Sequence, residues 1–159
     1  MHNSEAEARP TNVPWPPIVI VAAVGVAVAL GRIYPFDWPG LDDFPARIIG
    51  YGLGMAGLAL AGWGFLSLRR ANTTLLPTQA ADRLVTDGAF AFRRNPIYMG
   101  EVLVFLSVAE PTHNVWFVIL TPLLAVALYA LAIRAEEQHL EARFGQAYLD
   151  YKERTRRWF

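Results

Sequence analysis

The chain has 159 residues, of which 54% are hydrophobic and 18% charged, with 14 basic and 14 acidic side chains and no cysteine. Because nucleic-acid binding needs a basic surface that displaces counterions, the zero net charge argues against a nucleic-acid partner. The lack of cysteine excludes disulfides, thiolate nucleophiles and cysteine metal sites, and we expect no metal centre. The charges gather in a few blocks between long apolar stretches, a pattern typical of an integral membrane protein in contact with a lipid bilayer.

Residues 1–68 predict a tail and two transmembrane helices. Residues 1–16 are expected to form a polar N-terminal tail, and residues 17–68 contain two apolar stretches, 17–34 and 46–68. At about 1.5 Å per residue each stretch is long enough to cross about 30 Å of hydrocarbon. Ala27-Val28-Ala29 resembles a signal-peptide cleavage site, but acidic residues precede the first stretch, so we expect a retained helix.

Small residues recur along the second apolar stretch. Gly50, Gly54, Gly57 and Ala61 lie three or four residues apart and therefore share one face of a helix. Such spacing lets a neighbouring helix approach closely, which is the interpretation we favour over a path for a lipid or substrate.

Residues 69–159 predict a cytoplasmic loop, a helical hairpin and a C-terminal helix. A third helix is expected over 96–109, but it would span only about 21 Å, which suits a tilted or partly immersed element. Residues 110–114 should end it, and a fourth helix should follow over 115–133, with Pro122 as a possible kink. The fold class is thus all-α, with about four transmembrane or membrane-embedded helices.

The last part of the chain predicts an amphipathic helix on the membrane surface. Apolar residues recur there at helical spacing: Leu140, Phe144, Ala147, Tyr148 and Tyr151. We expect a break in this helix at Gly145. This helix suits either a surface anchor or a cap over a pocket. Arginines cluster around the middle loop and the C-terminus, so both should lie in the cytoplasm, and four crossings would place the N-terminus there too. We expect the bacterial inner (cytoplasmic) membrane.

Two polar clusters sit at the ends of the predicted hairpin. Arg94 precedes the helix start at Asn95-Pro96, where free N–H groups favour an anion. Glu136 and Glu137 lie at the other end of the hairpin and suit cations. S-adenosylmethionine carries a carboxylate, an ammonium and a sulfonium, and so matches this set, although arginine–glutamate pairs also serve structural roles in membranes. Four other arginines are interpreted as interfacial anchors: Arg69, Arg70, Arg156 and Arg157.

The C-terminal half resembles the isoprenylcysteine carboxyl methyltransferase and phospholipid methyltransferase superfamily of integral membrane enzymes. The resemblance rests on four pieces in order: Val85-Thr86-Asp87-Gly88 with Phe90, Arg94 to Gly100, Glu136-Glu137, and Phe144-Gly145 with Tyr148 and Tyr151. It implies a methyltransferase core in residues 69–159 that binds S-adenosylmethionine through Gly88, Arg94, Asn95, Pro96, Tyr98, Met99, Gly100, Glu136 and Glu137. Arg94 and Glu137 are the residues expected to be catalytic.

The resemblance also assigns individual roles. Arg94 would hold the cofactor carboxylate, Glu136 or Glu137 its ammonium or ribose, and Tyr98 the methionine or adenosine part, unless Tyr98 is only an interfacial aromatic. Asn95 stands where many members of the family have histidine, and an amide cannot act as a base near neutral pH, so a role in proton transfer there is in doubt.

The expected function is methyl transfer from S-adenosylmethionine to a small or lipid-like acceptor at the cytoplasmic membrane face. A phospholipid amine, a thiol and a carboxylate all remain open as acceptors. Two alternatives are an NADPH-dependent membrane reductase related to sterol reductases, which share a similar C-terminal pattern, and a non-catalytic membrane assembly protein that would use the glycine-spaced helix as its surface. The oligomeric state is left open.

Overall fold

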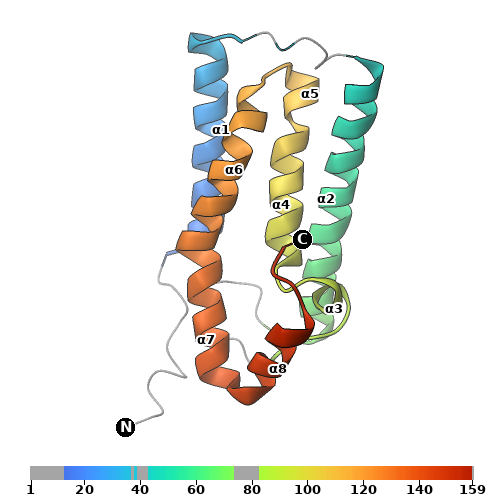
Figure 1. The fold of residues 1–159 in the computed structure, drawn as a ribbon, viewed down its shortest axis with the longest axis vertical. Coiled ribbons are helices and arrows are strands. Elements are labelled where there is room, and N and C mark those ends of the chain that lie inside the picture. The colour runs from blue at the N-terminus through green and yellow to red at the C-terminus, as the bar shows by residue number, and fades with distance from the viewer. Residues whose placement is uncertain (1–12, 37, 39–42, 74–82, 159) are drawn as a thin grey trace.

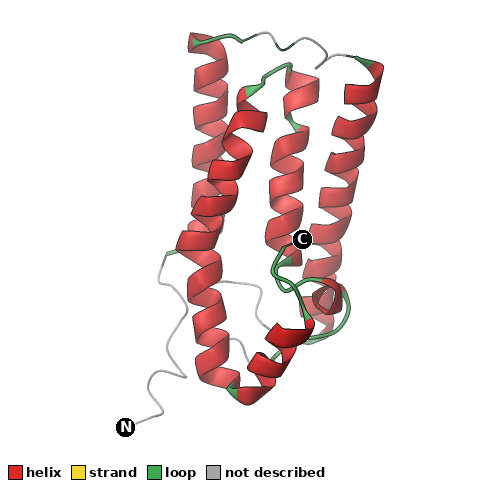
Figure 2. Ribbon diagram, in the orientation of Figure 1, coloured by secondary structure: helices red, strands yellow, loops and turns green. Residues whose placement is uncertain are grey.

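Helices make up all the regular structure of the chain in the residues that the computed structural model describes, which are 13–36, 38, 43–73 and 83–158 (Figure 2). Three helices are long and apolar enough to cross a membrane: α1 (Trp15–Ile33), α2 (Phe44–Arg70) and a continuous helix over Trp116–Phe144. The predicted all-α integral membrane fold is therefore confirmed. Most of the predicted polar tail, residues 1–12, and parts of the loop after α1 lie outside the described residues.

The third predicted helix is shorter than the other three. It forms α4 (Pro96–Ser107), which is only about 18 Å long, and a separate turn, α5 (Ala109–Thr112), follows it. We expected residues 110–114 to end the helix directly. The chain instead makes this extra turn and then reverses at His113, which has a left-handed backbone conformation. Figure 1 shows α4 and α5 lying beside α2, between α2 and α6.

The fourth predicted helix does not end at residue 133. The helix α6 (Trp116–Leu128) passes through a π-helical turn, η1 (Tyr129–Ile133), and continues as α7 (Arg134–Phe144). In this turn the N–H of Arg134 donates to the carbonyl of Tyr129, five residues back. Residues 123–144 contain no proline or glycine, so the polar residues from Arg134 onward extend the same helix instead of starting a separate one.

The C-terminal helix begins after a sharp turn. Gly145 adopts a φ of 51°, which glycine tolerates without strain, and α8 (Gln146–Arg154) follows it. The predicted break at Gly145 is confirmed. Tyr148 and Tyr151 face inward from α8 and are buried, whereas Ala147, which we expected on the same apolar face, is exposed.

Two further boundaries differ from the predicted ones. Helix α2 reaches Arg70 and starts at Phe44, because Pro45 is tolerated in its first turn. A single helical turn, α3 (Ala89–Phe92), lies within the predicted loop and packs against α2.

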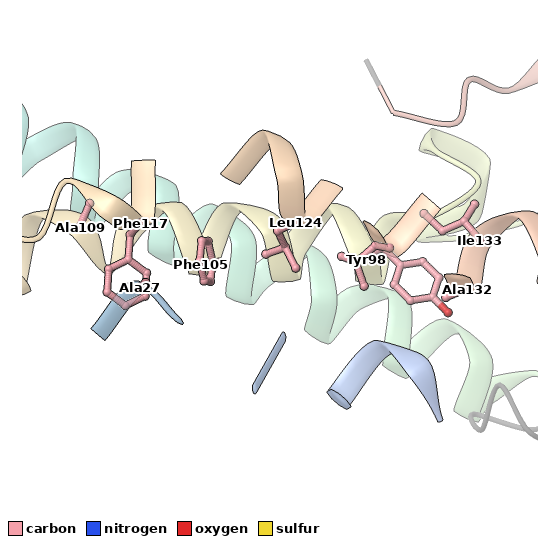
Figure 3. Close-up of a cluster of buried hydrophobic side chains, with 9 residues drawn as sticks. Ala27, Tyr98, Phe105, Ala109, Phe117, Leu124, Ala132 and Ile133 are labelled. Carbon is pink, nitrogen blue, oxygen red and sulfur yellow. The ribbon is translucent and has the colours of Figure 1, made fainter. Parts of the chain in front are cut away.

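The core joins α1, α4, α6 and η1 in one row of buried side chains. In Figure 3 Ala109, Phe117 and Ala27 lie toward one end of this row, and Tyr98, Ala132 and Ile133 lie toward the other. The rings of Phe105 and Phe117 pack with their centroids 5.0 Å apart. Tyr98 thus ends the apolar core at the side of the bundle where α7 begins.

Helix α2 packs against α4 through the small residues that the sequence singled out. A Cβ added at Gly57 would lie 2.7 Å from the carbonyl oxygen of Gly100, and one added at Gly54 would lie 2.9 Å from Ser107. At Gly100 an added Cβ would lie 2.8 Å from the Cβ of Ala61. The predicted close helix packing is confirmed, and it fixes the position of α4 and of the residues at its start.

Candidate functional site

Three segments meet at the end of the bundle where α4 begins. These are the residues before α4, the first turns of α7, and the segment after α8, which folds back toward α4 (Figure 1). The backbone N–H of Arg94 donates to the carbonyl of Arg156 at 3.0 Å, which fixes the last residues against the start of α4. Both polar clusters that the sequence predicted are therefore present at one place.

Glu137 is the centre of this polar cluster. Its carboxylate accepts hydrogen bonds from Nε and Nη2 of Arg157 at 2.9 and 2.6 Å. Nε of Arg94 and Nδ2 of Asn95 each lie 3.4 Å from its Oε1. The hydrogen bond to Glu137 raises the pKa of Arg157 above its ordinary value, so this guanidinium stays charged. Glu137 is thus neutralised by two arginines and holds three segments together.

Arg94 also binds the backbone of the C-terminal segment. Its Nη1 donates to the carbonyl of Lys152 at 2.7 Å and to the carbonyl of Thr155. Its Nη2 makes no hydrogen bond with any residue that the structure describes. Arg94 therefore has one nitrogen left for a ligand, while Nη1 holds the C-terminal segment and Nε contacts Glu137.

Two tyrosines of α8 lie beside the Glu137 cluster. The hydroxyl of Tyr151 donates to the carbonyl of Phe90 at 2.7 Å, which ties α8 to α3, and burial raises the pKa of Tyr151 to about 12. The ring of Tyr148 lies 6.1 Å from that of Tyr151, and its buried hydroxyl has no partner in the described part of the chain. Burial likewise raises the pKa of Tyr148 above its ordinary value. Both phenols are therefore neutral at physiological pH.

The other glutamate of the pair is arranged differently. Tyr98 Oη donates to Oε2 of Glu136 at 2.9 Å, and this neutral phenol is its one hydrogen-bond partner among the described residues. None of the described cations forms an ion pair with Glu136. Glu137 has two arginines, whereas the carboxyl group of Glu136 has no cation among the described residues and is available to a cationic ligand.

The remaining predicted residues either pack between helices or lie away from the Glu137 cluster. Pro96 and Gly100 face α2, Met99 is buried, and none of the three offers a side-chain hydrogen bond. Gly88 adopts a φ of 57° and lies against Ser67, whose hydroxyl accepts a hydrogen bond from the N–H of Ala89. No contact in the described residues brings Gly88 to the Glu137 cluster.

Sequence reasoning missed two charged residues. Arg157 was interpreted as an interfacial anchor, and this was wrong, because it forms the shortest ion pair of the cluster. No local pattern marks this pairing, since Arg157 reaches Glu137 only after the turn at Gly145. Glu101 was not singled out, although it is the one charged residue within the apolar helix α4, and such residues are often functional in membrane proteins.

The comparison with known families decides the class of the protein. Residues 45–147, about two thirds of the chain, match the phospholipid methyltransferase family. The chain belongs to this family. The match confirms the resemblance drawn from the sequence, and it makes the chain a membrane methyltransferase by family. No curated protein and no solved structure matches the chain.

The phospholipid methyltransferase match covers most of the site. It contains Arg94, Tyr98, Glu136 and Glu137, and it ends just after the turn at Gly145. Arg157 and the other residues that fold back onto the cluster lie beyond it, as does α1. The chain therefore completes its polar cluster with a segment outside the region that matches the family.

Proposed function

We propose that the protein transfers a methyl group from S-adenosylmethionine to a small or lipid-like acceptor at the cytoplasmic face of the membrane. The observation that carries the proposal is the carboxyl group of Glu136, which lies beside Tyr98 at the end of an apolar bundle and has no cation among the described residues, in a chain of the phospholipid methyltransferase family. The cofactor has two positive groups, an ammonium and a sulfonium, that suit such a site.

The residues present fit the amino-acid end of this cofactor. Glu136 has an oxygen, Oε1, without a partner among the described residues, and it would accept hydrogen bonds from the ammonium. Nη2 of Arg94 would donate to the carboxylate. Glu137 holds Arg94 and Asn95 and would position them. Tyr98 would orient Glu136 through its hydrogen bond.

When bound, S-adenosylmethionine supplies an activated methyl group, and the chain's own residues orient the reactants and exclude water. Tyr98 and Met99 are buried and border the apolar core, so they would keep water from one side of the site. Asn95 donates to Glu137 and has no basic group, so it takes no proton in the reaction.

The distribution of charge supports a cytoplasmic site. Arg69 and Arg70 end α2, and Arg93, Arg94 and Arg134 lie at the same end of the bundle as the cluster. The positive-inside rule places this end in the cytoplasm. Because α1 runs antiparallel to α2, its start would lie on the same side. We infer that both chain ends face the cytoplasm, in the bacterial inner membrane.

Equilibrium binding to detergent-purified protein tests the proposal. S-adenosylmethionine and S-adenosylhomocysteine should both bind, and Glu136→Gln should weaken binding about 10- to 100-fold, because it removes a charge-assisted hydrogen bond. Glu141→Gln is the matched control, since Glu141 lies on the same helix in an exposed ion pair, and it should leave affinity unchanged.

The same experiment separates the alternatives. Selective binding of NADPH would favour a membrane reductase. A folded protein that binds none of these ligands would favour a non-catalytic assembly role. Equal affinity of Glu136→Gln and the unmodified protein would remove Glu136 from the cofactor site.

A further inference from the structure

A polar cavity lies between the last turn of α2 and the loop before α3. Its volume is about 330 Å³, within the range of cavities that hold small ligands. Its polar side chains belong to Ser67, Arg70, Arg83, Thr86 and Asp87. No hydrogen bond or ion pair in the described part of the chain links these side chains to the Glu137 cluster. The cavity is therefore separate from the candidate site.

Buried contacts hold the two walls of the cavity together. Ser67 is buried in α2, and its hydroxyl donates to the carbonyl of Trp63 at 2.8 Å. The same hydroxyl accepts a hydrogen bond from the N–H of Ala89 at 3.2 Å. Gly88 packs directly against Ser67, and Val85 of the same loop is buried. The loop is thus fixed against α2, so the cavity is formed by the chain itself without a ligand.

Three charged side chains of the cavity have no partner. Arg70, Arg83 and Asp87 make no ion pair and no side-chain hydrogen bond with any residue that the structure describes. Arg93, after α3, differs from them, because its Nη1 donates to the carbonyl of Phe92 and its guanidinium lies 4.4 Å from the centre of the Phe92 ring. Two free guanidiniums and one carboxylate give the cavity a net positive charge, which complements an anion.

The cavity lies at the level of the lipid headgroups. Arg70 is the last residue of α2, one of the helices long and apolar enough to cross the membrane. Trp63, Phe65 and Leu66, in the turns just before it, are exposed and therefore face the acyl chains. An apolar surface thus leads directly to a basic cavity, which suits a molecule with acyl chains and an anionic head.

We propose that this cavity binds the phosphate group of an anionic phospholipid. Arg70 and Arg83 would donate paired hydrogen bonds to the phosphate oxygens, for which the planar guanidinium group is suited. Thr86 and Asp87 would form hydrogen bonds with the hydroxyl groups of a glycerol headgroup. Basic pockets at the ends of membrane helices are common binding sites for anionic headgroups. The proposal rests on charge and membrane level, and it holds whether or not the chain transfers a methyl group.

The bound lipid would have a different role from a methyl acceptor. Phosphatidylglycerol carries no amine, thiol or carboxylate that could be methylated. The turn α3 connects the cavity with the C-terminal helix, because the N–H of Ala89 bonds to Ser67 and the carbonyl of Phe90 accepts a hydrogen bond from Tyr151. A lipid in the cavity would therefore hold the loop against α2 and, through α3, stabilise the position of α8.

Equilibrium binding of short-chain phosphatidylglycerol to the full chain, purified in a non-ionic detergent, tests the proposal. Arg70→Gln and Arg83→Gln should each weaken binding about 10-fold, because each removes charge-assisted hydrogen bonds to the phosphate. Both side chains are exposed, so the fold should not change. Arg69→Gln is the matched control. It removes the same charge from the same end of α2 but does not line the cavity, and affinity should stay within about twofold.

Three outcomes would overturn the proposal. Equal losses of affinity in Arg69→Gln and Arg70→Gln would show attraction by diffuse positive charge instead of a site. Inorganic phosphate that binds as tightly as the lipid would exclude a phospholipid as the source of the phosphate group. Tighter binding of phosphatidylethanolamine than of phosphatidylglycerol would exclude an anionic headgroup. None of these results depends on S-adenosylmethionine, so each would leave the proposed function standing.

Discussion

Replacement of Gly100 by alanine should force α2 and α4 apart. A Cβ at this position would lie 2.5 Å from the carbonyl oxygen of Gly57 and 2.8 Å from the backbone nitrogen of Ala61. Ordinary contacts begin at 3.4 Å, so the helices would have to separate by about 0.9 Å. Both partners are backbone atoms and cannot rotate away. Overpacking of this kind costs about 1–3 kcal/mol, and we expect about 2 kcal/mol for Gly100→Ala.

The separation should also reach the site. Gly100 is only two residues from Tyr98, so a shift of α4 would lengthen the 2.9 Å hydrogen bond from Tyr98 to Glu136. We therefore expect weaker binding of S-adenosylmethionine together with lower stability, measured by unfolding in detergent. Gly62→Ala is the matched control: an added Cβ there meets nothing within 4 Å, and alanine favours the helix by up to about 1 kcal/mol. Equal stability of the two variants would refute the reasoning from backbone contact.

Three further changes test the C-terminal part of the site. Arg157→Ala should destabilise the protein by about 2 kcal/mol in thermal unfolding, because it leaves the buried Glu137 with a weaker counterion. Glu141→Ala in an exposed pair should cost less than about 0.5 kcal/mol, and similar losses in the two variants would contradict the role of Arg157 as the counterion of a buried carboxylate. Because the folded pKa of Tyr151 is raised from 10.0 to about 12, its stabilising contribution is complete below pH 10 and is lost as the pH rises toward 12. Unfolding followed between pH 9 and 12 should accordingly be less pH-dependent in Tyr151→Phe, and an unchanged slope would exclude this phenol. Gly145→Ala should cost about 1–3 kcal/mol through backbone strain alone, since the position has free space around it, and proteolysis of the last residues should become faster.

Local patterns predicted most of the fold. Two apolar stretches, the glycine spacing of α2 and the glycine turn at residue 145 each depend on residues close in the chain, and all were confirmed. The continuity of α6 with α7 was not predicted, because the change from apolar to charged residues at Arg134 was taken as the end of a helix. Polarity marks where a helix leaves the membrane, and here the helix itself ends only at the breaker residue Gly145.

The site was predicted only in part, because local patterns mark some of its residues and not others. Arg94 and Glu137 stand out because each lies at the end of an apolar helix, and the structure brings them together. The pairing of Glu137 with Arg157 depends on how the chain turns after α7, which no short pattern encodes. The difference between Glu136 and Glu137 is also invisible in sequence, since it is set by which partners each carboxylate meets in space.

The π-helical turn at Tyr129–Ile133 sets the direction in which the glutamate pair faces. A π turn holds one residue more than an α-helical turn, whereas each residue of a regular α-helix rotates the helix that follows by about 100°. The same residues closed into a regular helix would therefore swing Glu136 and Glu137 by about 100° away from Tyr98 and Arg94. Deletion of one residue from the turn would restore a regular helix and leave the pair facing the same way. The π turn thus absorbs one extra residue, and homologous chains can present the same pair either with this turn or with one residue fewer and a regular helix.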